Sequence, residues 1–573
     1  MSISRLPKRI AIIGGGPSGL FLYKNLIEKS SDITVDIFEQ KKYLGQGMPY
    51  SPEGSNAEHI TNVSGNEIPK LVTTVVEWVK GLPEDVLQKF GIDRSAFDAF
   101  KVLPRLLFGE YLNAQFNLLI EIANKKGIVT NVHLECRVTD IIYLEQSKHV
   151  LIKYAEDASK VFDYVTICTG HSWPRRYEQI IPGYFDSPYP PAKLSAVWNH
   201  PVAIRGSSLT AIDAIRTVAR NHGVFKQHSP HRLVYVPNEG VPDFRIVMHS
   251  KAGLLPAVRF HLEDPRLSTK SLVTKEEIAN HMKENDGFLP LDFIFKKDFI
   301  EPIVDKDPDL YERVKDMRLE EFVEVVMSMR ERIEPFLLFK SEYSEAKQSI
   351  QRKESIYWKE MLAVLSFAMN YPAKHFSAED MLRLKKVLMP LISIVIAFVP
   401  QSSCEEIIAL HEAGKLELIS VGDNSDVTIH ENGGIVYSHT DDQTGENFAT
   451  AYSTFIDCIG QHHFLKDAFP FKSLVEAGNV SGARLKFQHA AEAIKLMNEG
   501  DDAIEMDKNI YYLNVPGIAI TDKFNIIGVK GEKNPRIYIM AVPHIGGFNP
   551  DYSGLDFCEE ASTIITADIF AKE

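Results

Sequence analysis

Glycines near the start of the chain are the first residues whose spacing could serve chemistry. The segment Gly14-Gly15-Gly16-Pro17-Ser18-Gly19 has the GxGxxG spacing, which lets backbone amides approach a pyrophosphate closely. A helix that begins here would also hold the anion with the positive end of its dipole. We therefore predict that a dinucleotide is bound by Gly14, Gly16, Pro17, Ser18 and Gly19. The alternative is a glycine-rich turn without a ligand.

The elements around these glycines fit the same prediction. Ile10 to Ile13 is typical of a buried parallel strand, and Leu20 to Lys29 is typical of a helix. A second strand, Thr34 to Phe38, ends at Glu39, about 20 residues beyond the last glycine. A carboxylate here accepts hydrogen bonds from the adenosine ribose and repels a 2′-phosphate. Glu39 therefore favours FAD or NAD over NADP at this first site.

A weaker copy of the fingerprint lies further along the chain. A strand over Pro201 to Arg205 precedes Gly206-Ser207-Ser208-Leu209-Thr210-Ala211, in which Ser208 and Ala211 stand in place of two glycines. Small side chains still permit a close approach, and hydroxyl groups add donors near a phosphate. We predict that a second nucleotide is bound by Gly206, Ser207, Ser208 and Thr210. An ordinary strand-to-helix turn is the alternative.

The tip of the next strand sets this second site apart from the first. The strand Arg245 to His249 ends at Ser250 and Lys251, a hydroxyl and a cation, where the first site has Glu39. This pair suits the 2′-phosphate of NADPH and makes NADH the less favoured coenzyme. A solvated surface lysine is the alternative for Lys251.

Between these motifs and the C-terminal part, the pattern becomes long, charged and helical. Apolar residues recur at helical spacing over Leu310 to Arg332, Ser341 to Phe367 and Ala378 to Phe398. We interpret this stretch as a helical insertion that could be a lid, a dimer surface or a partner site. After it, three segments alternate like hairpin strands around the turn Glu431-Asn432-Gly433: Leu416 to Val421, Asp426 to His430 and Gly434 to His439.

Composition excludes several classes of function. The 573 residues carry 63 basic and 77 acidic side chains, and the net charge of −14 opposes binding to nucleic acid. The longest apolar run, Val387 to Val399, is too short to span a bilayer, so we expect no membrane partner. Five scattered cysteines indicate neither a disulfide framework nor a zinc site, which favours a cytoplasmic location.

Competing catalytic motifs do not occur in the sequence. We find no G-x-S-x-G elbow, H-E-x-x-H helix or Walker P-loop. Several histidines lack an obvious set of ligand partners, so no metal site is predicted: His222, His228, His231, His462 and His463.

These features predict an α/β fold with two Rossmann-like dinucleotide-binding domains, a discontinuous FAD domain and a large helical insertion. The predicted parts are the first part of the FAD domain (1–190), the first part of the NAD(P) domain (191–265), the insertion (266–415), the return strands of the NAD(P) domain (416–460) and the last part of the FAD domain (461–573).

Further motifs resemble one known family. They are Gly45-Gln46-Gly47-Met48-Pro49-Tyr50-Ser51, Thr61-Asn62-Val63, Pro104 to Leu112, Asp163 to Gly170 and Gly253-Leu254-Leu255-Pro256. With both nucleotide motifs, this set resembles the bacterial FAD-NAD(P)-binding family, which is related to flavin-dependent N-hydroxylating monooxygenases. The resemblance covers residue 8 to about 260 and resumes at about 450, with no motif match in the helical middle. Asp186-Ser187 stands where flavin monooxygenases usually carry His-Ser, which departs from the standard hydroxylases.

The resemblance implies further cofactor contacts. It places the ADP half of FAD at the first glycine motif and Glu39, and Asn62 and Arg105 nearer the flavin. It also implies cofactor contacts for Gln46, Thr169, Gly170, Gly546 and Gly547. An ion pair at a helix start is the equal alternative for Arg105, and a turn residue is the alternative for Asn62.

Function follows from the cofactors that are expected. We predict an FAD-dependent, NADPH-using oxidoreductase, in particular a monooxygenase of a small polar substrate such as an amine or amino-acid-like molecule. The alternatives are a flavin dehydrogenase or reductase with an acceptor other than oxygen, and a non-catalytic FAD/NAD(P)-binding protein. The sequence identifies no catalytic residue and fixes no oligomeric state.

Overall fold

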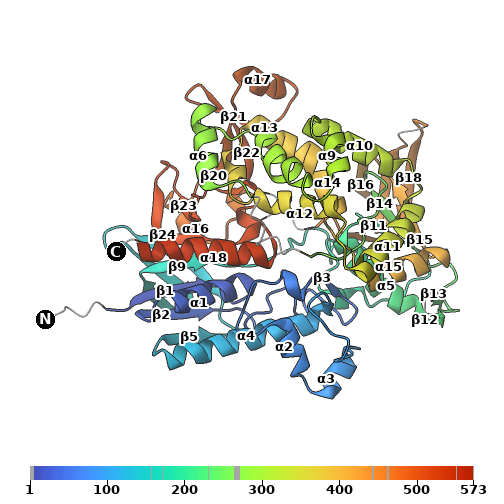
Figure 1. The fold of residues 1–573 in the computed structure, drawn as a ribbon, viewed down its shortest axis with the longest axis horizontal. Helices are drawn as coiled ribbons and strands as arrows, with labels where there is room; N and C mark the ends of the chain where they lie inside the picture. The colour runs from blue at the N-terminus through green and yellow to red at the C-terminus, as the bar shows by residue number, and fades with distance from the viewer. Residues whose placement is uncertain are drawn as a thin grey trace.

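Two larger β-sheets, one parallel throughout and one parallel except at one edge, and a helical segment form most of the molecule (Figure 1). The structure is a computed structural model that describes residues 6–155, 158–171, 173–229, 232–263, 272–441, 444–460, 464–549 and 552–571. The fold is therefore α/β, with a Rossmann-like unit around each parallel sheet.

The first sheet joins the two ends of the sequence. Its strand order is β23-β24-β9-β1-β2-β5, with neighbours parallel except β23 and β24. The strands are β1 (Lys8–Ile13), β2 (Ile33–Phe38), β5 (Val129–His133), β9 (Tyr164–Ile167), β23 (Asn525–Ile527) and β24 (Lys533–Ile539). Helix α1 (Pro17–Lys29) packs against α4 (Arg105–Lys125) and α18 (Gly554–Ala571), so the blue start and the red end of the chain lie side by side in Figure 1. We call the unit around this sheet the first half of the molecule, and the unit around the other parallel sheet the second half. The first half is discontinuous in sequence, because its strands come from both ends of the chain.

The second sheet is parallel throughout. Its order is β10-β19-β11-β14-β15. The strands are β10 (Tyr184–Phe185), β11 (Pro201–Arg205), β14 (Arg245–Ser250), β15 (Leu416–Ser420) and β19 (Thr454–Asp457). Helix α5 (Leu209–His222) follows β11 and packs against α15 (Gln401–Glu412). The residue bounds of the five parts given above stay predictions.

One expected hairpin strand belongs to this sheet instead. The prediction that 416–421 pairs with the strands after it is wrong, because β15 pairs in parallel with β14. Leu416 of β15 is buried and Glu417 is exposed, so this sequence alternates as that of a hairpin strand does. The hairpin of β16 (Ser425–Ile429) with β17 (Ile435–Thr440) is confirmed, and β18 (Asn447–Tyr452) extends it.

The helical segment contains shorter helices than the sequence predicts. Each of the three long predicted helices is divided: α9 (Pro308–Val314) from α10 (Leu319–Glu331), α11 (Pro335–Arg352) from α12 (Tyr357–Ala368), and α13 (Ala378–Arg383) from α14 (Met389–Val395) by a π-helical turn. Lys353 ends α11 in a left-handed conformation, with φ of +56°. Pro390 lies in the first turn of α14, where its missing N–H is tolerated. Local breaks of this kind do not change the spacing of the apolar residues, so the sequence pattern does not reveal them.

The helical segment shares its core with both halves. Phe299, Phe322 and Leu365 are buried in one cluster with the first sheet, whereas Phe336 and Phe339 join the cluster of the second sheet. The remaining helices of this segment are α6 (Lys275–Glu284), α7 (Leu291–Phe295) and α8 (Glu301–Ile303). This shared core fixes the segment to both nucleotide halves.

Smaller elements complete the fold. The small sheets are β3 (Ile60–Ser64) with β4 (Val102–Pro104); β6 (Val138–Leu144), β7 (His149–Tyr154) and β8 (Ala158–Phe162); β12 (Gly223–Ser229) with β13 (Arg232–Pro237); and β20 (Gly482–Lys486), β21 (Ile504–Asp507) and β22 (Ile510–Ile518). The short helices are α2 (Val75–Lys80), α3 (Glu84–Lys89), α16 (Lys472–Glu476) and α17 (Ala490–Asn498). Across the described ranges, no helix has the length and apolar character needed to cross a membrane.

Candidate functional site

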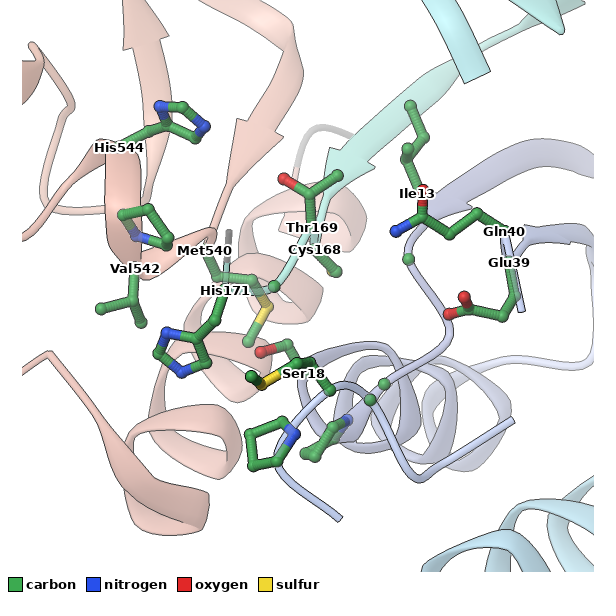
Figure 2. Close-up of a pocket in the computed structure, with 18 of the residues that line it drawn as sticks. Ile13, Ser18, Glu39, Gln40, Cys168, Thr169, His171, Met540, Val542 and His544 are labelled. Carbon is green, nitrogen blue, oxygen red and sulfur yellow. The ribbon is translucent and has the colours of Figure 1, made fainter. Parts of the chain in front are cut away.

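A cavity of about 590 Å³ opens where the first sheet meets the start of α1. Figure 2 shows its lining, with Glu39 at one end, Ser18 and Thr169 between, and His544 at the other end. Residues at and just after the carboxyl ends of β1, β2 and β9 line most of the cavity near Glu39, and the segment after β24 lines it near His544. A crevice at the carboxyl ends of parallel strands is where open α/β sheets bind ligands.

Three glycines shape the wall of this cavity beside α1. Gly14 has φ of +103°, and a Cβ there would lie 2.5 Å from the Cys168 carbonyl oxygen. A Cβ on Gly19 would lie 2.2 Å from the Gly14 oxygen, so Gly19 brings the helix close to the strand behind the cavity. Gly16 faces Gly47, whose Cα would be 3.2 Å from a Cβ on Gly16. The wall is therefore backbone, and side chains are excluded from it.

The first turn of α1 presents its amide end to the cavity. Gly16 is the N-cap and makes no side-chain cap, Pro17 occupies the first turn, and Gly16, Pro17 and Ser18 line the cavity. The first amides of a helix lack partners within the helix and attract anions. This backbone wall and helix start fit the diphosphate of a dinucleotide.

Glu39 is fixed at the far end of the cavity by backbone amides. Its side chain accepts hydrogen bonds at 2.8 Å from the amides of Gly15 and Lys41. Only 7% of the residue is exposed, and burial raises the pKa of its carboxyl group. A carboxylate has about four acceptor positions, so these backbone hydrogen bonds leave it able to accept from a ribose hydroxyl. Glu39 therefore fits the role that the sequence predicts for it.

The other end of the cavity is apolar, with neutral polar groups. Met540, Val542 and His171 lie at this end in Figure 2, and Tyr50, whose phenol pKa burial raises to about 12, also lines the cavity. His544 is 7% exposed, and burial lowers its pKa to about 4, so the imidazole is neutral. This end suits a flat, uncharged ring.

Some predicted cofactor residues lie outside this lining. Thr169 and Gly170 line the cavity, whereas Gly19, Gln46, Asn62, Arg105, Gly546 and Gly547 do not. A Cβ on Gly547 would lie 1.6 Å from the Pro516 oxygen, so this glycine serves packing against β22. Cofactor contacts for these residues stay predictions. Gly47 and His544 line the cavity, and the sequence analysis did not select them.

Arg105 takes part in a buried ion pair between the two halves. Its Nη1 donates to Asp213 Oδ2 at 2.5 Å, and its Nε donates to the Ile60 carbonyl at 3.1 Å. The Tyr189 hydroxyl donates to the same Oδ2 at 2.8 Å. Of the two alternatives for Arg105, the structure therefore contains the ion pair at the start of α4. Asn62 likewise uses its carbonyl to accept a hydrogen bond from Arg259.

The turn of the second half repeats the geometry of the first. Gly206 has φ of +107°, and its amide donates to the His249 carbonyl at 2.8 Å. Gly14 has the same bond, at 2.8 Å, to the Phe38 carbonyl. A Cβ on Gly206 would lie 2.9 Å from the Cys458 oxygen, as one on Gly14 meets Cys168. Both halves therefore contain the strand-turn-helix unit of a nucleotide site.

Some of the side chains that are predicted to contact phosphate in the second half already have protein partners. Ser208 is the N-cap of α5 without a side-chain cap, and Thr210 lies in the first turn, half-buried. The Ser207 hydroxyl donates to the Leu254 carbonyl at 2.7 Å. Ser250 ends β14, and the Lys251 Nζ lies 2.8 Å from Asp423 Oδ1 with both side chains exposed. An exposed pair of this kind contributes only about 0–1 kcal/mol, so a ligand phosphate could replace Asp423.

The cysteines around the cavity are not activated. Cys136, Cys168 and Cys558 line it and are free thiols. Burial raises the pKa of all three, and the Cys558 Sγ lies 3.4 Å from Ser18 Oγ. Thiols with raised pKa values are poor nucleophiles at neutral pH. Of the histidines considered above as ligands, His231, His462 and His463 lie outside the described residues.

Comparisons with known proteins assign two parts of the chain. Residues 11–172 match the family model described as FAD-NAD(P)-binding, so the predicted resemblance is confirmed there. Residues 274–396 match a YdhS-like middle domain, in the region where the sequence motifs found no match. The chain is 28% identical over 471 residues to the uncharacterized protein YdhS of Escherichia coli (strain K12), covering 82% of this chain and 86% of that protein.

The solved structures that the chain matches include two flavoproteins. One is the ornithine N-hydroxylase of Kutzneria sp. 744, at 13% identity, 99% coverage of both chains and a TM-score of 0.44. The other is the FAD-bound cadaverine monooxygenase of Erwinia amylovora, at 10% identity, 98% and 94% coverage and a TM-score of 0.46.

Proposed function

We propose that this chain is an FAD-dependent oxidoreductase that uses NADPH. The observation that carries the proposal is the cavity whose wall is the glycine backbone at Gly14 and Gly16 and whose end is closed by the buried Glu39. The same turn recurs at Gly206 in the second half. One half would hold a resident cofactor and the other the coenzyme that reduces it.

The residues of the chain bind and orient, while bound FAD would supply two-electron chemistry at its ring. The first amides of α1 would hold the diphosphate, and Glu39 would accept hydrogen bonds from the adenosine ribose. Met540, Val542 and Pro543 keep the opposite end apolar and exclude water there. No side-chain acid and base pair is required for this role.

The residues at the end of β14 favour NADPH over NADH. Ser250 and Lys251 occupy the position that corresponds to Glu39, so a cation replaces a carboxylate. Exchange of Asp423 for a phosphate would give Lys251 a partner of higher charge. Asp423 is 87% exposed in its side chain and regains full hydration when released.

We further propose that the reaction is the monooxygenation of a small polar substrate, an amine or amino-acid-like molecule. NADPH would supply two electrons, one oxygen atom would enter the substrate, and the other would leave as water. The apolar cavity end supports this reaction, because exclusion of water suppresses side reactions of reduced cofactors. Thiol-dependent disulfide reduction is disfavoured by the raised pKa of Cys168 and Cys558. Electron transfer to another acceptor is the alternative.

Anaerobic reduction tests the coenzyme assignment. Purified full-length protein is saturated with FAD, and loss of its visible absorbance is followed after NADPH or NADH is added. We expect faster reduction by NADPH, and in K251A a slower rate with NADPH only. Asp423→Ala is the matched control, because it frees Lys251 and should preserve the NADPH preference. Equal rates with both coenzymes in the unmodified protein would remove the assignment.

Two further measurements test the cofactor and the acceptor. Glu39→Arg should lower FAD occupancy, because it places a cation where ribose hydroxyls expect an acceptor. Full occupancy in this variant would contradict the placement of the adenosine. Under air, oxygen uptake that rises with an amine and yields an oxygenated product supports a monooxygenase. Reduction by NADPH with no oxygenated product from a panel of amines would favour the alternative acceptor.

A further inference from the structure

His544 is a buried imidazole at the cavity end opposite Glu39 (Figure 2). It ends a short 3-10 turn, Val542–His544, that follows β24. The His544 amide donates a hydrogen bond to the Ala541 carbonyl. Phe464 and Phe469 lie beside its ring, with ring centres 5.5 and 5.3 Å away. The ring is therefore held in place by aromatic neighbours and is more than nine-tenths buried.

The ring nitrogens of His544 have no partner among the residues that the structure describes. Within the described part of the chain, neither nitrogen makes a hydrogen bond, and burial alone perturbs its pKa. Buried polar groups are almost always hydrogen-bonded to protein or to ordered water. His544 lines the cavity, and its ring nitrogens are not completely enclosed by protein, so they are available to a ligand atom there.

Three other buried histidines show the usual arrangement. In His222, one ring nitrogen lies 2.7 Å from the Val218 carbonyl and the other accepts from the Trp198 amide at 2.7 Å. His59 and His249 also have partners at both nitrogens. These three imidazoles have protein partners. His261 is also buried without a ring hydrogen bond to the described residues, and His544 differs from it because it borders the cavity.

We propose that His544 hydrogen-bonds to the flavin ring of FAD bound in this cavity, as a neutral imidazole. The inference rests on the proposed function, which places the adenosine at Glu39 and hence the ring at the opposite end. A neutral imidazole has one donor and one acceptor nitrogen, and either can meet the polar edge of the ring. His544 would thereby hold the ring in one orientation against the apolar wall of Met540 and Val542.

His544→Phe tests this contact, because phenylalanine keeps the ring between its aromatic neighbours and removes both nitrogens. In the full-length protein we expect FAD to bind about 3- to 10-fold more weakly, as one hydrogen bond contributes. The absorption maxima of bound FAD should also shift. His222→Phe is the control: it removes a buried imidazole that does not line the cavity, and FAD affinity and absorption should stay unchanged in the folded protein. Unchanged affinity and absorption in H544F would overturn the proposal.

A second measurement uses the unmodified protein, in case H544F does not fold. Protein labelled with ¹⁵N-histidine is titrated with FAD, and the His544 resonances are assigned by their loss in H544Q. We expect the chemical shift of one ring nitrogen to change as FAD binds; constant shifts at saturating FAD would refute the contact. If the unmodified protein does not bind FAD at all, the proposed function fails, which is a different outcome from binding without a His544 effect.

Discussion

Replacement of Asp213 by alanine should loosen the contact between the two nucleotide halves. Asp213 lies on α5 of the second half and accepts hydrogen bonds from Arg105 at 2.5 Å and from the Tyr189 hydroxyl at 2.8 Å. Arg105 begins α4 in the first half, and its side chain is 14% exposed. The pair lowers the pKa of the Asp213 carboxyl, so the group is ionised at neutral pH. In D213A the guanidinium stays largely buried without its counter-charge.

The size of the effect follows from this burial. Removal of one partner of a buried ion pair costs about 3–5 kcal/mol, because the remaining charge is neither paired nor hydrated. Arg105 keeps its hydrogen bond to the Ile60 carbonyl, so we expect the lower end, about 3 kcal/mol. At about 1.4 kcal/mol per tenfold change, this corresponds to a roughly 100-fold increase in opening of the interface.

Hydrogen exchange measured by mass spectrometry can detect this opening directly. Amides at the start of α4 and along α5 should exchange roughly 100-fold faster in D213A. The double variant R105M/D213L replaces the pair by apolar groups and should return exchange near the original rate. Glu342→Ala is the control, because it breaks a buried pair with Arg330 inside the helical segment and should accelerate exchange there only. Exchange in D213A within about threefold of the unmodified protein would refute a buried, unpaired charge.

Two further predictions concern packing and pH. Gly19→Ala places a Cβ 2.2 Å from the Gly14 oxygen and should displace α1, so that the purified protein contains little FAD. Gly482→Ala is the control and should retain FAD, because nothing lies within 4 Å of its Cβ. Full flavin content in G19A would contradict the close packing. Asp298 is fully buried in the helical segment, where burial raises its pKa from 3.8 to about 7 while Oδ1 accepts from the Val273 amide. The folded state therefore binds the proton more tightly than the unfolded state, and its stability falls as pH rises from about 4 to about 7. Asp298→Asn removes this loss and should be up to about 4 kcal/mol more stable than the original at pH 8 but not at pH 4, as urea unfolding would measure; equal differences at both pH values would contradict the raised pKa.

The first nucleotide turn could be predicted because its determinants are local. Gly14 has a positive φ and Gly19 lies against the Gly14 oxygen, so both requirements arise within one strand, one turn and one helix, and Glu39 directly follows the next strand. The turn at Gly206 follows the same rule with fewer glycines, and the structure gives it the same backbone geometry. When the contacts that require a particular residue all lie within a short stretch of chain, that residue can be predicted from the sequence.

The rest of the site depends on contacts between distant segments. Gly47 meets Gly16 across a loop, and His544 reaches the cavity from the last sixth of the chain. Arg105 pairs with Asp213, more than 100 residues away, so its sequence context could not decide between a flavin contact and an ion pair. Residues of this kind have no periodic or spacing signal, because the partner that gives them meaning is brought close only by folding.

The two nucleotide turns share a backbone but differ at the strand tip, and this difference suits two kinds of ligand. Glu39 is buried and already held by two backbone amides, so it loses little conformational freedom when a ribose binds. Lys251 is 74% exposed in its side chain, has to leave Asp423, and has to be ordered when a phosphate binds. Preorganisation favours slow release at the first site, whereas the ordering cost favours rapid exchange at the second. On the proposed function, FAD would remain bound through many turnovers, while NADPH would enter and leave in each one.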